Sequence, residues 1–214
     1  ISLLMKQYIF MADIIDSGEK VQIKLMQDFK NLIEDANKAF KASLLSPLTI
    51  TLGDEFQGVL KDLSSSVKMM MYLEEQIIHH NLRFQLRYVL HYGCIETPIN
   101  PDIAYQMLGK GLTEARNILN TSKKQKDRFS IFIADATKNA ILKNAFRIYE
   151  NIISDWDPKK DYEVVSNFIK FEDYKIVSEK VGKTRSQIWK REKTLNITAY
   201  QSVKNIILLT THQA

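Results

Sequence analysis

Two apolar, β-rich runs that end abruptly on carboxylates constrain the fold of this chain more than any other feature. Residues 8–14 are YIFMADI, and residues 48–56 are LTITLGDEF. The first run predicts a buried strand, and the second predicts two short strands joined by a tight turn at Gly53. Because a helix-length segment separates the two runs, we expect Asp13 and Asp54 to lie side by side where neighbouring strands end.

Hydrophobic periodicity predicts that strands and helices alternate through the first part of the chain. Apolar residues recur at helical spacing over 19–43 and again from about 64 to 80. Strands are expected at 8–14, 47–52, 56–60 and 82–92, the last with the alternation of a half-exposed strand. The resulting order, βαββαβ, is the split-βαβ arrangement of ferredoxin-like and palm domains.

The next segment is expected to add a strand and further helices to this core. We predict a helix near 102–120, a solvated loop at 123–128, a strand at 129–134 and one or two helices over 135–156.

A charged, proline-containing stretch at 155–160 favours a division into two domains. Residues 1–157 would form the palm domain, and residues 158–214 would form a small all-α domain. The predicted fold class is therefore α+β, an α/β sandwich with an added strand and helices, followed by helices alone.

Composition limits the class of protein. The chain has 214 residues, of which 45% are hydrophobic and 26% charged, as in an ordinary globular protein. Its single cysteine, Cys94, excludes an intramolecular disulfide and favours a cytoplasmic location. The apolar runs near the start are short and broken by Lys6 and Asp13, so we expect neither a signal peptide nor a membrane partner.

Carboxylates at the ends of the predicted strands favour a divalent cation. Oxygen ligands of this kind suit Mg²⁺ or Mn²⁺, which would bridge the carboxylates to phosphate groups that they would otherwise repel. The expected metal ligands are Asp13 and Asp54, joined by the Ile14 carbonyl, with Asp16 and Glu55 as outer or alternate ligands.

The same acidic residues also have a structural explanation. Asp16 followed by Glu19 has the spacing of a helix capping box, and Ser17 is also a good cap. Asp54 after Gly53 suits a tight turn. The residues alone leave open a structural pair, a binding site and a catalytic site.

The runs DIIDS at 13–17 and TLGDEFQG at 51–58 resemble the SatD family of bacterial proteins, and the resemblance extends over nearly the whole chain. Over residues 7–143 the chain also resembles class III nucleotidyl cyclases and diguanylate cyclases. This second resemblance implies that Asp13 and Asp54 hold a metal for attack of a 3′-hydroxyl on an α-phosphate.

Several positions depart from the cyclase pattern. Ile50 stands where many cyclases have a purine-selecting Lys, and Leu112 stands where an Asn is expected if Arg116 is the Arg that stabilises the transition state. Lys110 and Arg116 remain candidates for binding phosphate. The resemblance therefore supports binding of a metal and a nucleotide better than it supports turnover.

Residues 174–193 have the spacing of a helix-turn-helix, the motif that places its second helix in the major groove of DNA. Gly182 would supply the turn, Ile188 would anchor the second helix, and Val177, Ser178 and Val181 would pack between the helices. Trp189 or Leu195 is expected to complete this core. The residues expected to meet DNA are Lys183, Thr184, Arg185, Ser186, Gln187, Lys190, Arg191 and Lys193.

The excess positive charge lies in this C-terminal part. Residues 1–158 hold 19 Lys and Arg against 19 Asp and Glu, whereas residues 159–214 hold 11 against 6. A basic surface of this kind attracts nucleic-acid phosphates. A further helix at about 199–209 would cover the motif or form a dimer contact through Val203, Ile206, Ile207 and Leu209, and the cyclase resemblance implies a homodimer.

Three functions remain open for the chain. The favoured hypothesis is a DNA-binding regulatory protein whose palm domain binds a divalent metal and a nucleotide or another phosphorylated ligand. The first alternative is a metal-dependent nucleotidyl cyclase or nucleotidyltransferase. The second is a degenerate palm domain that serves only as a dimerisation scaffold.

Overall fold

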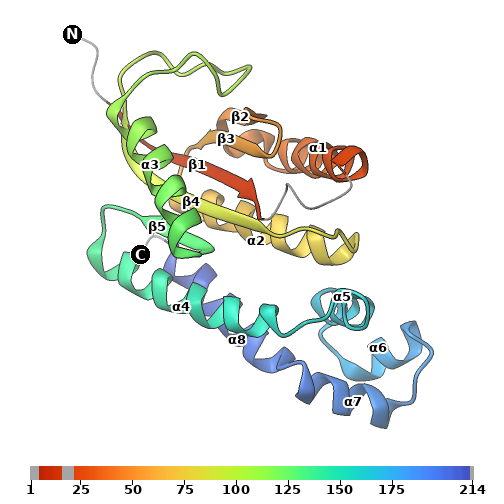
Figure 1. Cartoon of the computed structure of the whole chain (residues 1–214). Coiled ribbons are helices and arrows are strands. Elements are labelled where there is room, and N and C mark those ends of the chain that lie inside the picture. The colour runs from red at the N-terminus through yellow and green to blue at the C-terminus, as the bar shows by residue number, and fades with distance from the viewer. Residues whose placement is uncertain (1–4, 16–21, 213–214) are drawn as a thin grey trace.

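A computed structural model describes residues 5–15 and 22–212, which form a mixed α+β protein with helices on both faces of a five-stranded sheet (Figure 1). The mixed α+β class predicted from the sequence is therefore confirmed. The strands are β1 (Met5–Ile14), β2 (Leu44–Ile50), β3 (Glu55–Leu60), β4 (Leu86–Ile95) and β5 (Phe129–Phe132). The helices are α1 (Gln22–Ala39), the short 3-10 helix η2 (Lys41–Ser43), α2 (Leu63–His79), α3 (Lys110–Gln125), α4 (Ala136–Ser154), α5 (Tyr162–Phe171), α6 (Tyr174–Lys180), α7 (Arg185–Thr194) and α8 (Ile197–Thr210).

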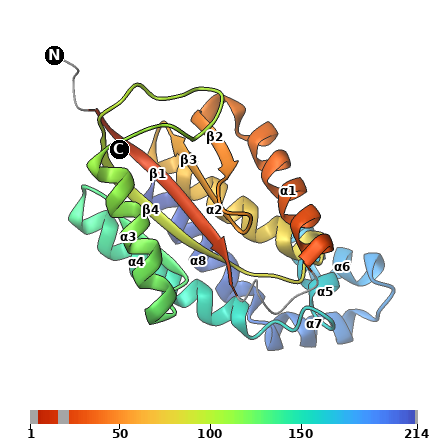
Figure 2. The same cartoon turned by 45° about the horizontal axis from the view of Figure 1, so that its top comes forward.

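The strand β1 lies in the middle of the sheet, whose strand order is β2-β3-β1-β4-β5 (Figure 2). It is antiparallel to β3 and β4, while β5 runs parallel to β4. Because successive side chains of a strand point to opposite faces, Phe10 and Ala12 join the core beneath α1 and α2, whereas Ile9 and Met11 join the core beneath α3. Burial on both faces explains why residues 8–12 of this strand are all apolar.

The helix predicted near 102–120 begins later and ends later than expected, at Lys110 and Gln125. Its start packs directly on the backbone of β4: a Cβ atom built on Gly111 would come within 2.6 Å of the Gly93 carbonyl carbon. Glycine is needed at such a close approach because any side chain would collide with the strand. Residues 123–125 consequently lie in the last turn of α3 and not in the predicted loop.

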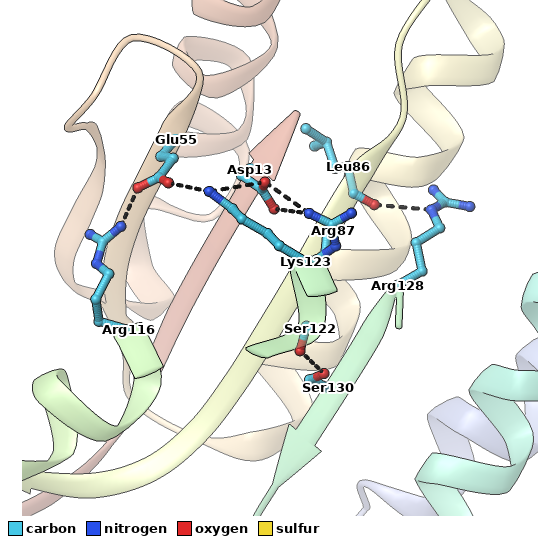
Figure 3. Close-up of polar contacts among 9 residues, drawn as sticks. All are labelled: Asp13, Glu55, Leu86, Arg87, Arg116, Ser122, Lys123, Arg128 and Ser130. Carbon is cyan, nitrogen blue, oxygen red and sulfur yellow. Dashed lines mark hydrogen bonds and ion pairs between the residues drawn. The ribbon is translucent and has the colours of Figure 1, made fainter. Parts of the chain in front are cut away.

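The structure also buries β4 and Arg128 more deeply than the sequence predicted. The strand β4 is not half-exposed, because α3 covers the face that carries Arg87 and Val89. Arg128, expected in a solvated loop, is 5% exposed and donates two hydrogen bonds of 2.5 and 2.6 Å to the Glu74 carboxylate of α2. It also donates to the Leu86 carbonyl, at 3.0 Å (Figure 3).

The helix α2 contacts the sheet on one side and C-terminal helices on the other. Its N-terminus is capped by Asp62, which accepts a hydrogen bond from the Ser65 N–H at 2.7 Å. Near its C-terminal end, His79 Nδ1 lies 2.7 Å from the Ser166 hydroxyl of α5. The helices α4 and α8 also pack side by side (Figure 1). One continuous buried cluster therefore extends from the sheet to α8.

No helix of the described residues is long and apolar enough to cross a membrane.

Candidate functional site

A row of charged side chains crosses three strands at one end of the sheet. Asp13 of β1 lies opposite Glu55 of β3 on one side and opposite Arg87 of β4 on the other. Asp13 follows Ile9 and Met11 at intervals of two residues, so the row faces α3. Asp13, Glu55 and Arg87 are 3%, 4% and 8% exposed. Two carboxylates and a guanidinium group are thus withdrawn from most of the solvent.

The helix α3 brings two more cations to this row (Figure 3). Lys123 Nζ lies 2.7 Å from Glu55 Oε1 and 3.4 Å from Asp13 Oδ2. Arg116, about two helical turns earlier, donates to Glu55 Oε2. Arg87 Nη1 donates to both oxygens of Asp13, at 3.0 and 3.3 Å. We call these five residues the sheet-end cluster; with three cationic and two anionic side chains, it has one positive charge in excess when all are ionised.

Burial and ion pairing act in opposite directions on the pKa values of this cluster. Burial raises the pKa of Asp13 above its ordinary value of 3.8, although Arg87 and Lys123 oppose the shift. Burial by itself would lower the pKa of Lys123, but the hydrogen bond to Glu55 and the charges of Asp13 and Glu55 outweigh it and raise this pKa above 10.5. Lys123 is therefore positively charged at neutral pH.

The five expected metal ligands are only partly brought together. Glu55 faces Asp13 directly. Asp54 lies next to the end of β1, where its backbone carbonyl accepts a hydrogen bond from the Ile14 N–H at 2.9 Å, and its side chain is half-buried. Asp16 lies outside the described residues. The predicted convergence of β1 with the hairpin is thus present, but its buried acidic pair is Asp13 with Glu55.

A divalent cation does not fit the residues as they stand. The position between Asp13 and Glu55 where Mg²⁺ or Mn²⁺ would bridge two carboxylates is taken by the Lys123 ammonium group. Within residues 5–15 and 22–212, no three His, Cys, Asp or Glu side chains are grouped so as to hold a metal ion. The carboxylates of Asp13 and Glu55 already serve cationic side chains.

Of the two candidate phosphate ligands, only Arg116 reaches this cluster. The Lys110 side chain is 79% exposed and lies 3.8 Å from Glu114. Both residues lie in the N-terminal part of α3, whereas Lys123 lies in its last turn. Thirteen residues of helix separate Lys110 from Lys123, which corresponds to roughly 20 Å. Lys110 therefore lies away from the Lys123 end of the cluster, which Arg116 joins.

Arg87 and Lys123 are the members of the cluster that the sequence prediction missed. Lys123 lies seven residues after Arg116, the spacing of two side chains on one helix face, but only once the helix is known to continue to Gln125. Arg87 alternates with apolar residues and faces the helix-covered side of β4. The position of Arg87 opposite Asp13 could have identified it as a member of the cluster. That position is known only once the pairing of β1 with β4 is known.

Towards the C-terminus, α6 and α7 are joined by a short turn (Figure 1). Gly182 in this turn has φ of +64°, a conformation that favours glycine. Thr184 and Gln187 cap α7 reciprocally: the Thr184 hydroxyl accepts from the Gln187 N–H, and Gln187 Oε1 accepts from the Thr184 N–H. The expected core positions Val177, Ser178 and Ile188 are buried, and Val181 packs against them in part.

The outward surface of α7 and the preceding turn is basic and polar. Leu195, 4% exposed, completes the core beneath it, whereas Trp189 is 48% exposed with the Lys193 ammonium 5.9 Å from its ring centroid. Seven of the eight residues expected to meet DNA are exposed: Lys183, Thr184, Arg185, Ser186, Gln187, Lys190 and Lys193.

Arg191 is the exception among these eight residues. Its side chain is 36% exposed and forms an ion pair with Asp161 at the start of α5. Asp161 is itself 7% exposed, so this pair holds α7 to α5 at a position where the helix-turn-helix pattern usually has an apolar residue. The Arg191 side chain is thus directed toward Asp161, and its expected contact with DNA stays a prediction.

Two of the four expected dimer residues of α8 are used within the chain itself. Val203 and Ile207 are 3% and 0% exposed in the core that α8 shares with α4. Ile206 and Leu209, by contrast, are 49% and 69% exposed. Only these two of the four are available to another molecule.

The fold and its two charged regions define a mixed α+β protein in which a buried ionic cluster at the sheet end and an exposed basic helix belong to one chain. A family model for the SatD family matches residues 8–208. The match covers nearly all of the chain, which therefore belongs to the SatD family. A search of the curated proteins found no match.

Proposed function

We propose that this SatD-family chain is a DNA-binding regulatory protein that uses α6 and α7 as a helix-turn-helix. The observation that carries the proposal is the environment of α7, whose residues are all described. Ile188 is its one buried residue, while its basic and polar side chains other than Arg191 and Glu192 face solvent after a capped N-terminus. A helix held from beneath and charged on its outer surface suits insertion into the major groove.

The exposed residues divide by position into two kinds of contact. Arg185 and Ser186 lie in the first turn of α7, the part of a recognition helix that meets base edges. Lys183, Lys190 and Lys193 lie around it and would neutralise phosphates. We also propose that Trp189 contacts DNA, because its exposed ring would pack against the DNA backbone.

For the N-terminal part, we propose a palm domain that binds a phosphorylated ligand, with nucleotides as the first class to test. The order β2-β3-β1-β4, antiparallel at each pairing, supports the βαββαβ assignment. The excess positive charge of the sheet-end cluster supports an anionic ligand. Arg116 and Lys123, whose side chains are 30% and 36% exposed, would meet it first.

The alternative of a nucleotidyl cyclase or nucleotidyltransferase has less support. Such an enzyme would need Asp13 and a hairpin carboxylate free to hold metal, but Asp13 and Glu55 are both paired with cations. Formation of a cyclic nucleotide or another product from ATP or GTP with Mn²⁺, abolished by Asp54→Asn, would establish that activity. The scaffold alternative predicts that no nucleotide binds and that Asp13→Ala and Asp54→Ala affect stability alone, while DNA binding remains open.

A homodimer is part of the proposal. Exposed Ile206 and Leu209 on α8 support a contact between two copies, and two α7 helices related by a twofold axis would read a palindromic site.

The test begins with selection of binding sequences from a random pool of double-stranded DNA, followed by fluorescence anisotropy on the selected site at fixed salt. Arg185→Ala should weaken binding about tenfold, in line with roughly 1–3 kcal/mol for a good base contact. Lys190→Ala should weaken binding to all sequences alike and reduce its dependence on salt, as expected for a lost phosphate contact. Lys24→Ala, an exposed change of the same charge on α1, is the matched control and should bind like the wild type. Failure to select any sequence would refute DNA recognition.

A further inference from the structure

The cyclase resemblance implies a divalent metal at the end of the sheet, but the chain already has a cation there. Glu55 Oε1 and Asp13 Oδ2 both point at Lys123 Nζ, at 2.7 and 3.4 Å (Figure 3). The two carboxylates thus converge on one positive atom, as they would on a metal ion. The atom belongs to a side chain of α3.

The remaining oxygens of these carboxylates are also occupied by cations. Arg116 bonds the second oxygen of Glu55, and Arg87 bonds both oxygens of Asp13. A divalent ion placed beside Asp13 and Glu55 would therefore be close to three positive side chains, in a partly buried place where solvent screens repulsion weakly. Metal binding would require Lys123 to leave.

The backbone that carries Lys123 is held in place. The adjacent Ser122 is 3% exposed, and its hydroxyl lies 2.7 Å from the Ser130 hydroxyl of β5 (Figure 3). At the other end of the helix, Gly111 packs closely on Gly93 of β4. Both ends of α3 are thus fixed to the sheet, and the fold sets the backbone position from which Lys123 reaches the two carboxylates.

We propose that the Lys123 ammonium group takes the place of the divalent metal, so that the sheet-end cluster excludes metal and binds phosphate groups with protein cations alone. The phosphate part rests on the ligand binding proposed above, whereas the exclusion of metal does not. Arg116 and Lys123 share Glu55 and lie on one face of α3. A guanidinium group has five N–H donors and an ammonium group three, so both retain donors for a phosphate.

Titration of Mn²⁺, followed by the electron paramagnetic resonance signal of the free ion, tests the exclusion of metal. The wild type should not deplete free Mn²⁺ at submillimolar concentration. Lys123→Met removes the charge at similar length and should bind Mn²⁺ at least about tenfold more tightly, by the like-charge argument. Lys124→Met, the same change at the exposed neighbouring residue, should behave like the wild type. Equal Mn²⁺ affinity of the wild type and Lys123→Met would overturn the proposal.

Two further measurements keep the proposal testable if Lys123→Met folds poorly. Lys123→Arg keeps the charge and should exclude Mn²⁺ as the wild type does; strong Mn²⁺ binding by this variant would contradict the role of the charge. Calorimetric titration of the wild type with ATP and GTP, in EDTA and in Mg²⁺, needs no variant.

The nucleotide titration separates this proposal from the function on which it rests. Equal affinity in EDTA and in Mg²⁺ supports a metal-independent site. Binding in Mg²⁺ alone overturns metal independence but leaves the proposed ligand function standing. If neither nucleotide binds under either condition, the phosphate part fails for this ligand class together with the ligand function, while the Mn²⁺ result still decides whether Lys123 excludes metal.

Discussion

Lys123 Nζ lies 2.7 Å from Oε1 of Glu55, although 68 residues separate them in the sequence. The contact joins the last turn of α3 to the first residue of β3. Because Glu55 also bonds Arg116, one buried carboxylate holds two points of α3 against the end of the sheet.

Glu55→Gln should therefore lower the stability of the whole chain. The amide keeps the shape of the side chain but leaves Arg116 and Lys123 without their shared counter-charge. We expect a loss of about 2–4 kcal/mol in the free energy of unfolding, somewhat below a fully buried pair because both cations are partly exposed. Urea denaturation measures it. The control is Glu34→Gln, whose exposed pair with Lys30 should contribute less than about 0.5 kcal/mol.

Glu74→Gln should be at least as destabilising, because its partner Arg128 is 5% exposed and has no comparable access to water. Breaking one partner of a buried ion pair typically costs about 3–5 kcal/mol. The Tyr88 hydroxyl, which donates to Glu74 at 2.8 Å, would also lose its charged acceptor. A double variant, Glu74→Leu with Arg128→Met, should recover part of the loss; if it is less stable than Glu74→Gln, the unpaired charge is not the cause.

The histidine contact between α2 and α5 should make stability depend on pH. Burial lowers the pKa of His79 below its ordinary value of 6.5, so between these two values the folded chain binds fewer protons than the unfolded chain. The free energy of unfolding should consequently rise with pH through this window and level off above about pH 6.5.

His79→Gln should reduce that slope, measured by urea denaturation from pH 5 to 8. His212→Gln, at an exposed position, should keep it. An unchanged slope in His79→Gln would assign the dependence to other titrating groups.

Arg191→Ala and Lys190→Ala should differ although they are adjacent on α7. Arg191 pairs with buried Asp161, so its loss should destabilise the chain by about 1–3 kcal/mol and reduce DNA affinity through misplacement of α7. Lys190 is exposed, and its loss should change DNA affinity with less than about 0.5 kcal/mol of stability. Thermal unfolding and anisotropy on the same samples distinguish them; equal effects on both quantities would contradict the different roles.

Features set by neighbouring residues were predictable from the sequence. The apolar run of β1 and the turn at Gly182 depend on local pattern, and both are present as expected. The convergence of Asp13 with the β2–β3 hairpin also followed from the order of strands and helices.

Features set by contacts between distant segments were not predictable in the same way. Lys123 and Arg128 lie in a run of charged residues that is typical of a loop, and their partners Glu55 and Glu74 are far away in the sequence. The extension of α3 to Gln125 depends on its packing against β4 and β5, which no local pattern encodes. The metal prediction therefore named both carboxylates of the cluster, Asp13 and Glu55, but not the cations around them.

The position of α2 between the sheet and α8 has a consequence for dissecting this protein. Tyr200 and Lys204 of α8 both bond Glu75 of α2, and the Tyr200 ring lies 5.6 Å from that of Tyr149 in α4. A fragment that ends at residue 157 would expose these apolar surfaces to water and leave Glu75 without either partner. Ligand titrations on this fragment would thus measure a protein with a partly exposed core. All 214 residues are the proper unit for biochemical work.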